Sequence, residues 1–490
     1  MHIVFVYAAY ENLGIEYLSA VLKRAGHRVS LAYSPLIFRD SLVNSSSLGV
    51  FFNRDAFMIH KIVALKPDLV AFPAVTDWFR WMYRIAEKVK SRMPSVPVIF
   101  GGIHPSTAPE FLISQPAIDY ICLGEGEDAL LELVTTLESG GDPSGIANIW
   151  GKFFRNAPRP LIKNLDCLPF PDHELFYEKV PYFKSVYTIL GSRGCPYSCT
   201  YCCNNCLRKL YAGDEPFFRK RSVANIISEL KYALEKWRFK SVLIEDDLFT
   251  GDTGRIRDFC EQYKAWIRKP FVCVTHPLAV HKEELDMLKD AGCIQIEIGV
   301  QTMNEKVRKK HLDRHETNPD IVNALRTLHE SGIPFNIDHI VGLPDDTFEW
   351  QLFALRLYNE VRPNRLLFFH ITCYPRTDIA GTFEQRGRLS DDLKQKILEG
   401  RSESDEQHGS IEDQELQKNL DQLRFIFGWL PVLPKRLVRR LMKPEQLSRL
   451  PRSPLLCKVL PVLYSILKGH EPRGMTILKK YLYHVLRMGF

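Results

Sequence analysis

The sequence predicts an α/β protein with a doubly wound parallel sheet, then a partial six-stranded barrel, then a mostly α-helical C-terminal region. This prediction rests on three observations. Short apolar runs alternate with amphipathic helical stretches over 1–145, and the same alternation returns over 185–375. A proline-punctuated linker, 146–184, separates the two series. The 490 residues, 45% of them hydrophobic, also exceed what a single core accommodates.

The first series is expected to form a Rossmann-like domain. Its strands are predicted at 2–7, 29–32, 69–73, 96–100 and 120–123, with helices at 14–25 and 81–92. Ligands of such sheets bind beyond the carboxyl ends of the strands, where small residues let a bulky ligand approach the backbone. The small or polar candidates at this edge are Asn12, Leu13, Gly14, Thr76, Gly101, Gly102, His104, Gly124, Glu125 and Gly126.

The second series predicts a partial (β/α)6 TIM-like barrel. Its strands are expected at 186–191, 241–245, 271–275, 294–299, 334–341 and 366–372. The intervening helices are expected at 222–237, 255–267, 282–291, 318–331 and 347–361, the first of them capped by Ser222. Chemistry in parallel barrels collects at the carboxyl ends of the strands. The residues that follow each strand are therefore the candidates for the active site.

A loop after the first barrel strand carries three cysteines in the spacing C-x-x-x-C-x-x-C: Cys195, Cys199 and Cys202. Three thiolates at this spacing can hold one 4Fe-4S cluster and leave its fourth iron without a protein ligand. Structural zinc is the alternative, but Cys203 and Cys206 do not supply the separate second pair that zinc sites usually have. The start of the chain lacks the features of a secretory signal, which predicts a reducing cytosolic location without disulfides.

The cysteine loop, with Tyr201 just before its last cysteine, resembles the signature of the radical S-adenosylmethionine superfamily over about 185–375. The resemblance implies that S-adenosylmethionine chelates the open iron. It also implies cofactor contacts at the carboxyl ends of the second and fourth strands, from Tyr201, Glu245, Asp246, Glu297, Gly299 and Gln301. The acidic run 245–247 has a second interpretation as a solvated turn or a helix cap.

The strand-end loops of the first 140 residues, with Gly-Gly-x-His-Pro-Ser followed by Gly-Glu-Gly-Glu, resemble the cobalamin-binding domain fused ahead of many radical S-adenosylmethionine enzymes. The D-x-H-x-x-G signature of a lower cobalt ligand is absent, because Ile121 stands two residues after Asp119. His104 is the nearest other candidate ligand, with a loop histidine bonded to the backbone as the alternative. A dinucleotide is less compatible, because no G-x-G-x-x-G follows the first strand.

Three further polar positions in the barrel are less specific. The run 345–347 is expected to cap the following helix, although the same turn resembles a family motif in which Asp345 replaces a glycine. His339 and His370 lie on predicted strands. Each is either a substrate-facing residue or an ordinary core histidine, and neither is assigned a catalytic role.

The C-terminal region, 376–490, carries the positive charge of the chain. Helices are expected at 389–399 and 414–429, and from Leu430 onward thirteen Lys or Arg residues stand against Glu445 and Glu471. Mixed basic and apolar residues at helical spacing suit either an anionic membrane surface or a cap packed on the barrel. The formal net charge of +7 is modest, and no RNA-binding module accompanies it, so no nucleic acid partner is expected. No apolar run is long enough to cross a bilayer.

Together the two resemblances imply an enzyme that uses a 4Fe-4S cluster, S-adenosylmethionine and cobalamin. The activity implied is reductive cleavage of S-adenosylmethionine to a 5′-deoxyadenosyl radical and transfer of methyl from methylcobalamin to an unactivated carbon of a small-molecule or lipid-like substrate. A cyclase, oxidase or rearrangement enzyme without methyl transfer is the alternative, and a non-catalytic redox or cobalamin sensor is a remote one. The expected partner is a one-electron donor such as a flavodoxin or ferredoxin. The expected location is the cytoplasm, with the inner face of the membrane as a further option.

Overall fold

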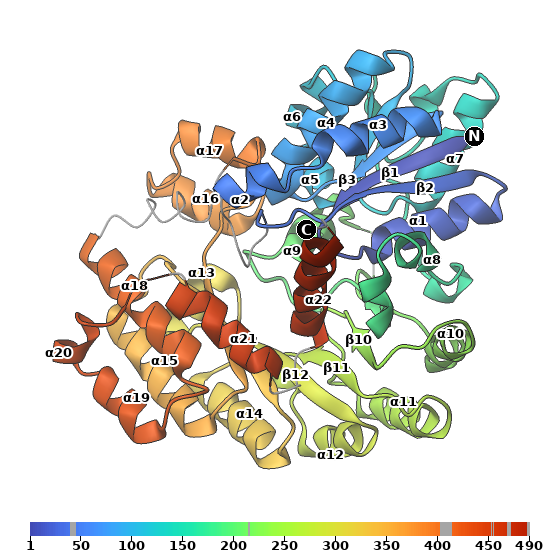
Figure 1. Ribbon diagram of the computed structural model, residues 1–490. Coiled ribbons are helices and arrows are strands. Elements are labelled where there is room, and N and C mark those ends of the chain that lie inside the picture. The colour runs from blue at the N-terminus through green and yellow to red at the C-terminus, as the bar shows by residue number, and fades with distance from the viewer. Residues whose placement is uncertain are drawn as a thin grey trace.

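The computed structural model describes residues 1–39, 46–213, 216–401, 414–451, 453, 455–467 and 472–487 (Figure 1). Two parallel sheets dominate it, one in the upper part of the view and one in the lower part. Helices of the C-terminal region flank the barrel, and one of them stands between the two sheets.

The first sheet has the strand order β2-β1-β3-β4-β5-β6 and confirms the doubly wound arrangement. Its helices are α1 to α7, and all seven residues of β1 are buried, as expected for a parallel strand with both faces covered. The last strand, β6, pairs antiparallel with β5 and lies in the stretch expected to be a linker. The strands are β1 (His2–Ala8), β2 (Arg28–Ser34), β3 (Leu69–Pro73), β4 (Val98–Gly101), β5 (Tyr120–Cys122) and β6 (Ile149–Gly151). The helices are α1 (Leu13–Arg24), α2 (Ser46–Phe51), α3 (Asp55–Leu65), α4 (Phe79–Arg92), α5 (Ile103–Thr107), α6 (Pro109–Ser114) and α7 (Glu127–Glu138).

The segment that joins the two sheets packs into the core of the first one. Helix α8 (Glu174–Tyr177) and the short helix η4 (Pro181–Ser185) follow β6. Phe176 of α8 and Phe183 of η4 are buried among the residues of the first sheet. The proline-rich stretch is therefore a structured connection that fixes where the barrel begins.

The second sheet has the order β14-β13-β12-β11-β10-β7, with every pair parallel. This confirms the partial (β/α)6 barrel, open between β14 and β7. A two-stranded ribbon, β8 (Ser192–Arg193) with β9 (Arg219–Lys220), and helix α9 (Cys203–Leu210) flank the cysteine loop. The strands are β7 (Val186–Ile189), β10 (Ser241–Ile244), β11 (Phe271–Thr275), β12 (Cys293–Gln301), β13 (Phe335–Val341) and β14 (Arg365–His370). The helices are α10 (Val223–Lys236), α11 (Thr253–Trp266), α12 (Lys282–Asp290), α13 (Glu305–Leu312), α14 (Asn318–Ser331) and α15 (Phe348–Val361).

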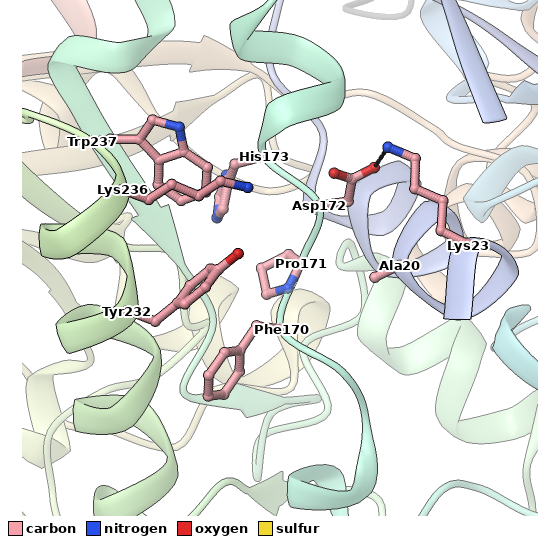
Figure 2. A pocket seen from close by; sticks show the side chains of 9 residues that line it. All are labelled: Ala20, Lys23, Phe170, Pro171, Asp172, His173, Tyr232, Lys236 and Trp237. Carbon is pink, nitrogen blue, oxygen red and sulfur yellow. Dashed lines mark ion pairs between the residues drawn. The ribbon is translucent and has the colours of Figure 1, made fainter. Parts of the chain in front are cut away.

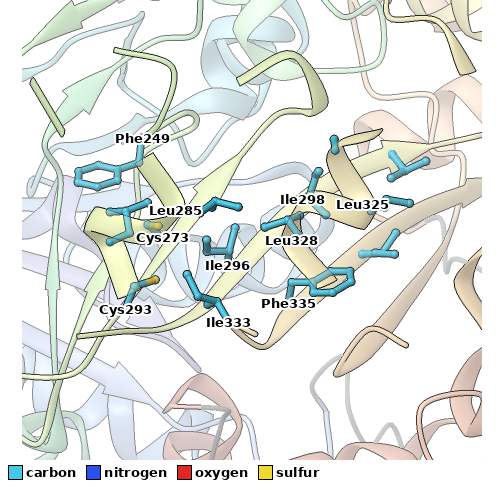
Figure 3. Close-up of a cluster of buried hydrophobic side chains, with 14 of the residues drawn as sticks. Phe249, Cys273, Leu285, Cys293, Ile296, Ile298, Leu325, Leu328, Ile333 and Phe335 are labelled. Atoms are coloured by element: carbon cyan, nitrogen blue, oxygen red, sulfur yellow. The ribbon is translucent and has the colours of Figure 1, made fainter. Parts of the chain in front are cut away.

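The barrel core lies between the strands and the helices outside them. Ile296 and Ile298 of β12 pack with Leu325 and Leu328 of α14 (Figure 3). Cys273 and Cys293 are buried in the same cluster, as expected of small apolar core residues. Ser222 caps α10 as predicted, with its side chain accepting a hydrogen bond from the Asn225 N–H.

The C-terminal helices divide into a group on the barrel and a helix between the sheets. Helices α18 and α19 supply Leu423, Ile426 and Val438 to the barrel core, which is the packed-cap arrangement. Helix α22 stands between the two sheets (Figure 1). Within the part of the chain that the structure describes, every helix is too short or too polar to traverse a bilayer. The helices are α16 (Asp378–Gln385), α17 (Asp391–Leu398), α18 (Gln414–Trp429), α19 (Lys435–Leu441), α20 (Pro444–Leu447), α21 (Leu460–Leu467) and α22 (Pro472–Arg487).

Candidate active site between the two sheets

The three predicted cluster cysteines lie in the loop between β8 and α9, at the carboxyl edge of the barrel. Cys199 is buried, whereas Cys195 and Cys202 are partly exposed. The loop is held by a hydrogen bond from Arg208 Nη2 to the Cys195 carbonyl (2.5 Å) and by one from the Thr200 N–H to the Leu312 carbonyl (3.1 Å). Burial raises the pKa of Cys195 to about 11 and also raises that of Cys199. Such thiols become thiolates when a metal binds them, so this donor set fits an iron–sulfur cluster.

Asp246, a predicted S-adenosylmethionine contact, supports the base of this loop. Its Oδ1 atom accepts hydrogen bonds from the N–H groups of Gly191 (2.5 Å) and Ser192 (3.1 Å), and burial raises the pKa of the carboxyl to about 6. Burial is the main cause that raises the pKa of Cys195, and a hydrogen bond with Cys203 is the main cause for Cys202. The charge of Asp247, which is exposed, raises both pKa values further. The structure thus directs Asp246 toward the backbone and Asp247 toward the cysteines.

Arg314 connects the cysteine loop to the fourth barrel strand, β12. The guanidinium donates to the Tyr201 hydroxyl (3.4 Å), to the Gly299 carbonyl (2.7 Å) and to Glu316 (2.7 Å). Tyr201 and Gly299, both predicted cofactor contacts, are therefore brought together. Gln301 adopts a φ of 67°, and a Cβ atom on Gly299 would lie 2.5 Å from its Nε2 atom, so a larger residue at 299 would displace the Gln301 side chain. Arg314 lies in no motif, and sequence analysis missed it.

Glu245 and Glu297, the other predicted acidic contacts, share one cation. Arg473 of α22 lies 2.9 Å from Glu245 and 2.7 Å from Glu297, measured between guanidinium nitrogen and carboxylate oxygen. Asp338 of β13 stands opposite Gly299 in the sheet, and its Oδ1 atom is buried without a hydrogen-bond partner. Burial and the charge of Glu297 raise the pKa of Asp338 well above its usual value. Three carboxyl groups in one region form a site suited to a cationic ligand group such as an amine. Neither Arg473 nor Asp338 lies in a sequence motif, so neither was predicted.

The carboxyl edge of the first sheet holds the predicted cobalamin contacts. Asn12 caps α1, accepting from the Ile15 N–H (2.9 Å) and donating to the Tyr7 hydroxyl (3.0 Å). His104 is fully buried, and its nitrogens lie 3.0 Å from Thr76 Oγ1 and 3.1 Å from the Leu398 carbonyl. Burial lowers the pKa of His104 to about 4. Both ring nitrogens are occupied, which is the arrangement of a loop histidine rather than of a cobalt ligand.

Glycines at this edge allow close packing. Gly102 has a φ of 95°, and a Cβ atom there would lie 3.1 Å from the Ala74 carbonyl oxygen. A Cβ atom on Gly124 would lie 1.9 Å from the Tyr211 hydroxyl.

Glu125 binds Arg193 (3.1 Å) and Arg219 (2.9 Å), which come from the β8–β9 ribbon. The loop 124–126 therefore joins the first sheet to the region of the cysteine loop. The remaining predicted contacts lie at the start of α1 (Leu13 and Gly14), at the end of β4 (Gly101) and before α7 (Gly126).

A cavity of about 560 Å³, here called the interdomain chamber, lies between the carboxyl edge of the first sheet and the barrel, where its lining extends from the start of β7 to the end of β10. Glu11, Asn12 and Leu13 line it from the first sheet, and Leu243 and Glu245 line it from the barrel. Helix α22 forms a further wall through four residues at spacing i, i+3, i+4, i+7, which is one helix face. These wall residues are Arg473, Thr476, Ile477 and Lys480.

A buried charge cluster links the two sheets beside this chamber. His173 Nδ1 lies 3.2 Å from Glu11 and 2.9 Å from Glu16, and Glu11 accepts a hydrogen bond from Thr188 of β7 (3.1 Å). Burial alone would lower the pKa of His173, but the two carboxylates raise it to about 10. His173 also borders a smaller cavity of about 300 Å³ with Trp237, where Lys23 and Asp172 form an ion pair (Figure 2). No motif predicted this cluster.

The remaining polar positions of the barrel have structural partners. His339 is buried between the Tyr358 hydroxyl (2.9 Å) and Gln351 (2.8 Å), which makes it a satisfied core histidine. Arg424 of α18 lies 2.8 Å from His370. The run 345–347 was predicted to cap α15, and Thr347 does occupy the cap position. The expected capping hydrogen bond from its side chain is absent, and Asp345 instead pairs with Arg386.

Two family models match separate parts of the chain. The family model described as B12 binding domain matches residues 3–134, and the one described as Radical SAM superfamily matches residues 189–356. An uncharacterized methyltransferase of Pyrococcus horikoshii is 25% identical over 376 residues, which is 74% of this chain and 79% of that protein. An anaerobic magnesium-protoporphyrin IX monomethyl ester cyclase of Rubrivivax gelatinosus is 25% identical over 406 residues, 77% of this chain and 69% of that protein. The solved structure of the cobalamin-dependent S-adenosylmethionine radical enzyme OxsB, with aqua-cobalamin and S-adenosylmethionine bound, shares the fold. Its TM-score is 0.64 at 17% identity, covering 99% of this chain and 79% of that one.

Proposed function

Because the chain belongs to the cobalamin-dependent radical S-adenosylmethionine enzymes, as its B12-binding and radical SAM domains establish, we propose that it is a C-methyltransferase acting in the interdomain chamber. One observation carries the assignment of the chamber. The cavity is lined from one side by Asn12 and Leu13 and from the other by Glu245. A substrate held there touches both predicted cofactor edges, which is what methyl transfer between them demands.

When bound, the cluster and S-adenosylmethionine supply a radical that abstracts hydrogen, and cobalamin supplies the methyl group. We assign the cluster to Cys195, Cys199 and Cys202. The contacts of S-adenosylmethionine are then Tyr201, Glu245, Asp247, Glu297, Gly299 and Gln301, with Asp246 holding the loop. Cobalamin is assigned to Asn12, Leu13, Gly14, Thr76, Gly101, Gly102, Gly124, Glu125 and Gly126, with His104 holding its own loop through Thr76 and Leu398.

The protein's contribution is to position the reacting groups and to exclude water. Val186, Leu243 and Ile477 present apolar side chains to the chamber, and α22 closes the side between the two sheets. A dry chamber protects a carbon radical from side reactions. Arg473 holds Glu245 and Glu297 in one geometry.

Radical SAM enzymes act on small molecules and take electrons from external donors. We propose a flavodoxin or ferredoxin as the one-electron donor. The apolar wall of the chamber supports a lipid-like substrate, and contact of the C-terminal region with a membrane would bring the enzyme to such molecules. A cyclase or rearrangement activity is the second candidate, because the Rubrivivax relative is a cyclase.

The test is anaerobic reconstitution with iron, sulfide and hydroxocobalamin, followed by product analysis after reduction with S-adenosylmethionine. We expect 5′-deoxyadenosine together with S-adenosylhomocysteine and a methylated product. Cys199→Ala should lose the cluster spectrum, whereas the neighbouring Cys203→Ala should keep it. Formation of 5′-deoxyadenosine without S-adenosylhomocysteine would favour the cyclase or rearrangement activity. A cluster without stoichiometric cobalamin would contradict the assignment of the first sheet.

A further inference from the structure

Helices α2 and α3 carry an unusual group of large apolar side chains in water. Val50 is 69% exposed, Phe51 is 72% exposed and Phe57 is 65% exposed, and Leu48 lies beside them at 44%. Single exposed apolar residues are ordinary on protein surfaces, but a contiguous group marks an interaction site. These four residues are here called the apolar patch.

The patch continues through aromatic contacts to the helix that walls the chamber. The rings of Phe51 and Phe52 lie 5.3 Å apart, those of Phe52 and Phe38 lie 5.0 Å apart, and Phe38 lies 5.3 Å from Tyr481 of α22. Figure 1 shows α2 close to the C-terminal end of α22. Tyr481 directly follows Lys480, which lines the interdomain chamber.

Basic side chains lie on and next to the helices that carry the patch. Arg54 stands exposed at the start of α3, and Arg80 is exposed on α4. Burial lowers the pKa of Arg84, the charges of Arg39 and Arg80 lower it further, and the charges of Asp55 and Glu87 oppose this shift. Asp55 also accepts a hydrogen bond from the Trp81 indole (3.1 Å). Four arginines and two carboxylates therefore lie on α3, on α4 and in the segment before α2, which gives this region an excess of positive charge.

We infer that α2 and α3 form a docking surface for an anionic lipid membrane. Exposed aromatic and aliphatic side chains insert at the boundary between headgroups and acyl chains, and the surrounding arginines attract the anionic headgroups. The contact is peripheral, since no described helix is fit to span a bilayer. This surface lies on the first sheet's helices and is separate from the contact proposed for the basic C-terminal region. The aromatic rings from Phe51 to Tyr481 connect this surface to the helix that walls the chamber. Passage of a lipid from the surface into the chamber is the one part of this inference that rests on the proposed function.

The test is flotation of the full chain with vesicles of phosphatidylcholine, with or without phosphatidylglycerol, which requires no turnover. We expect the wild-type protein to float with the anionic vesicles at low salt. The Phe51→Asp/Phe57→Asp variant should bind the anionic vesicles at least roughly tenfold more weakly than the wild type, because two apolar anchors are lost and two negative charges are added. Phe153→Asp is the matched control, since Phe153 is 100% exposed outside the patch, and it should float like the wild type.

A second variant separates charge from apolar contact. Arg54→Gln/Arg80→Gln should weaken binding to anionic vesicles roughly thirtyfold, at about 1 kcal/mol for each of the two charges, and leave any residual binding to neutral vesicles unchanged. Failure of the wild type to float with anionic vesicles would overturn the proposal, as would equal flotation of the Phe51→Asp/Phe57→Asp variant. A concentration-dependent dimer that this variant abolishes, without flotation, would assign the patch to a second copy of the chain instead.

Discussion

The guanidinium Nη1 atom of Arg473 lies 2.7 Å from Oε2 of Glu297, although the two residues are 176 positions apart. The same guanidinium also pairs with Glu245, which directly follows β10, the second strand of the barrel. A residue of the C-terminal helix therefore supplies the cation that two carboxylates of the barrel share. Because α22 also walls the interdomain chamber, the C-terminal region lines the proposed active site and also contributes to the barrel's outer packing.

Replacing Arg473 by Ala should lower turnover without removing the cofactors. The change leaves Glu245 and Glu297 without their shared cation, and we expect kcat/KM to fall by roughly tenfold to a hundredfold as both carboxylates move. The measurement is steady-state kinetics together with iron and cobalamin content, which should stay at wild-type levels. Arg439→Ala, an exposed arginine of α19, should change neither. Unchanged kinetics of the Arg473 variant would show that α22 has no part in the reaction.

Asp246 should control assembly of the cluster rather than affinity for S-adenosylmethionine. Asp246→Ala removes the acceptor of the Gly191 and Ser192 N–H groups, and two buried donors without partners cost about 1–3 kcal/mol each. We expect reduced iron content after reconstitution and a lower melting temperature. Asp246→Asn keeps a carbonyl acceptor and should recover part of both. A normal cluster with weakened cofactor binding would instead restore Asp246 as a direct contact.

The acidic run was predictable from the sequence, but the partner of each carboxylate was not. Glu245, Asp246 and Asp247 follow β10, which ends at Ile244. Strand alternation therefore does not assign their directions, and the different partners of Glu245 and Asp246 depend on the packing of the turn after the strand. The strands themselves were predicted to within a few residues, since buried parallel strands appear as short apolar runs. β6 was missed because three residues in a proline-rich stretch carry no such signal.

The contacts that define the chamber could not be predicted in the same way. Arg473, Arg314 and His173 act through partners far away in the sequence, and no local spacing encodes those pairs. His173 illustrates the reason. Its imidazole is buried between Glu11 and Glu16 only because the connecting segment folds back onto α1. Long-range pairs of this kind follow from the packing of whole elements, which periodicity alone does not specify.

His104 should make the protein sensitive to acid. Its pKa is about 4 in the folded protein and near 6.5 when unfolded, so its contribution to stability is present above pH 6.5 and is lost as the pH falls through 4. A shift of that size corresponds to about 3 kcal/mol. Urea unfolding of the wild type and of His104→Gln at pH 7 and pH 4 measures it. The difference in unfolding free energy between the two proteins should shrink at pH 4. A constant difference would mean that His104 is not buried in its neutral form.

The buried ion pairs of His173 should contribute more to the free energy of unfolding than the partly exposed Lys23–Asp172 pair nearby. His173→Leu leaves Glu11 and Glu16 buried without the cation between them, and we expect a loss of about 3–5 kcal/mol in the free energy of unfolding. Lys23→Ala breaks the partly exposed pair with Asp172 and should cost less than about 1 kcal/mol. Chemical denaturation measures both losses. The double variant His173→Leu/Glu16→Leu should recover part of the loss, because it removes a buried charge along with its partner. If His173→Leu costs no more than Lys23→Ala, the cluster holds no buried charge and the connection between the sheets depends on apolar packing alone.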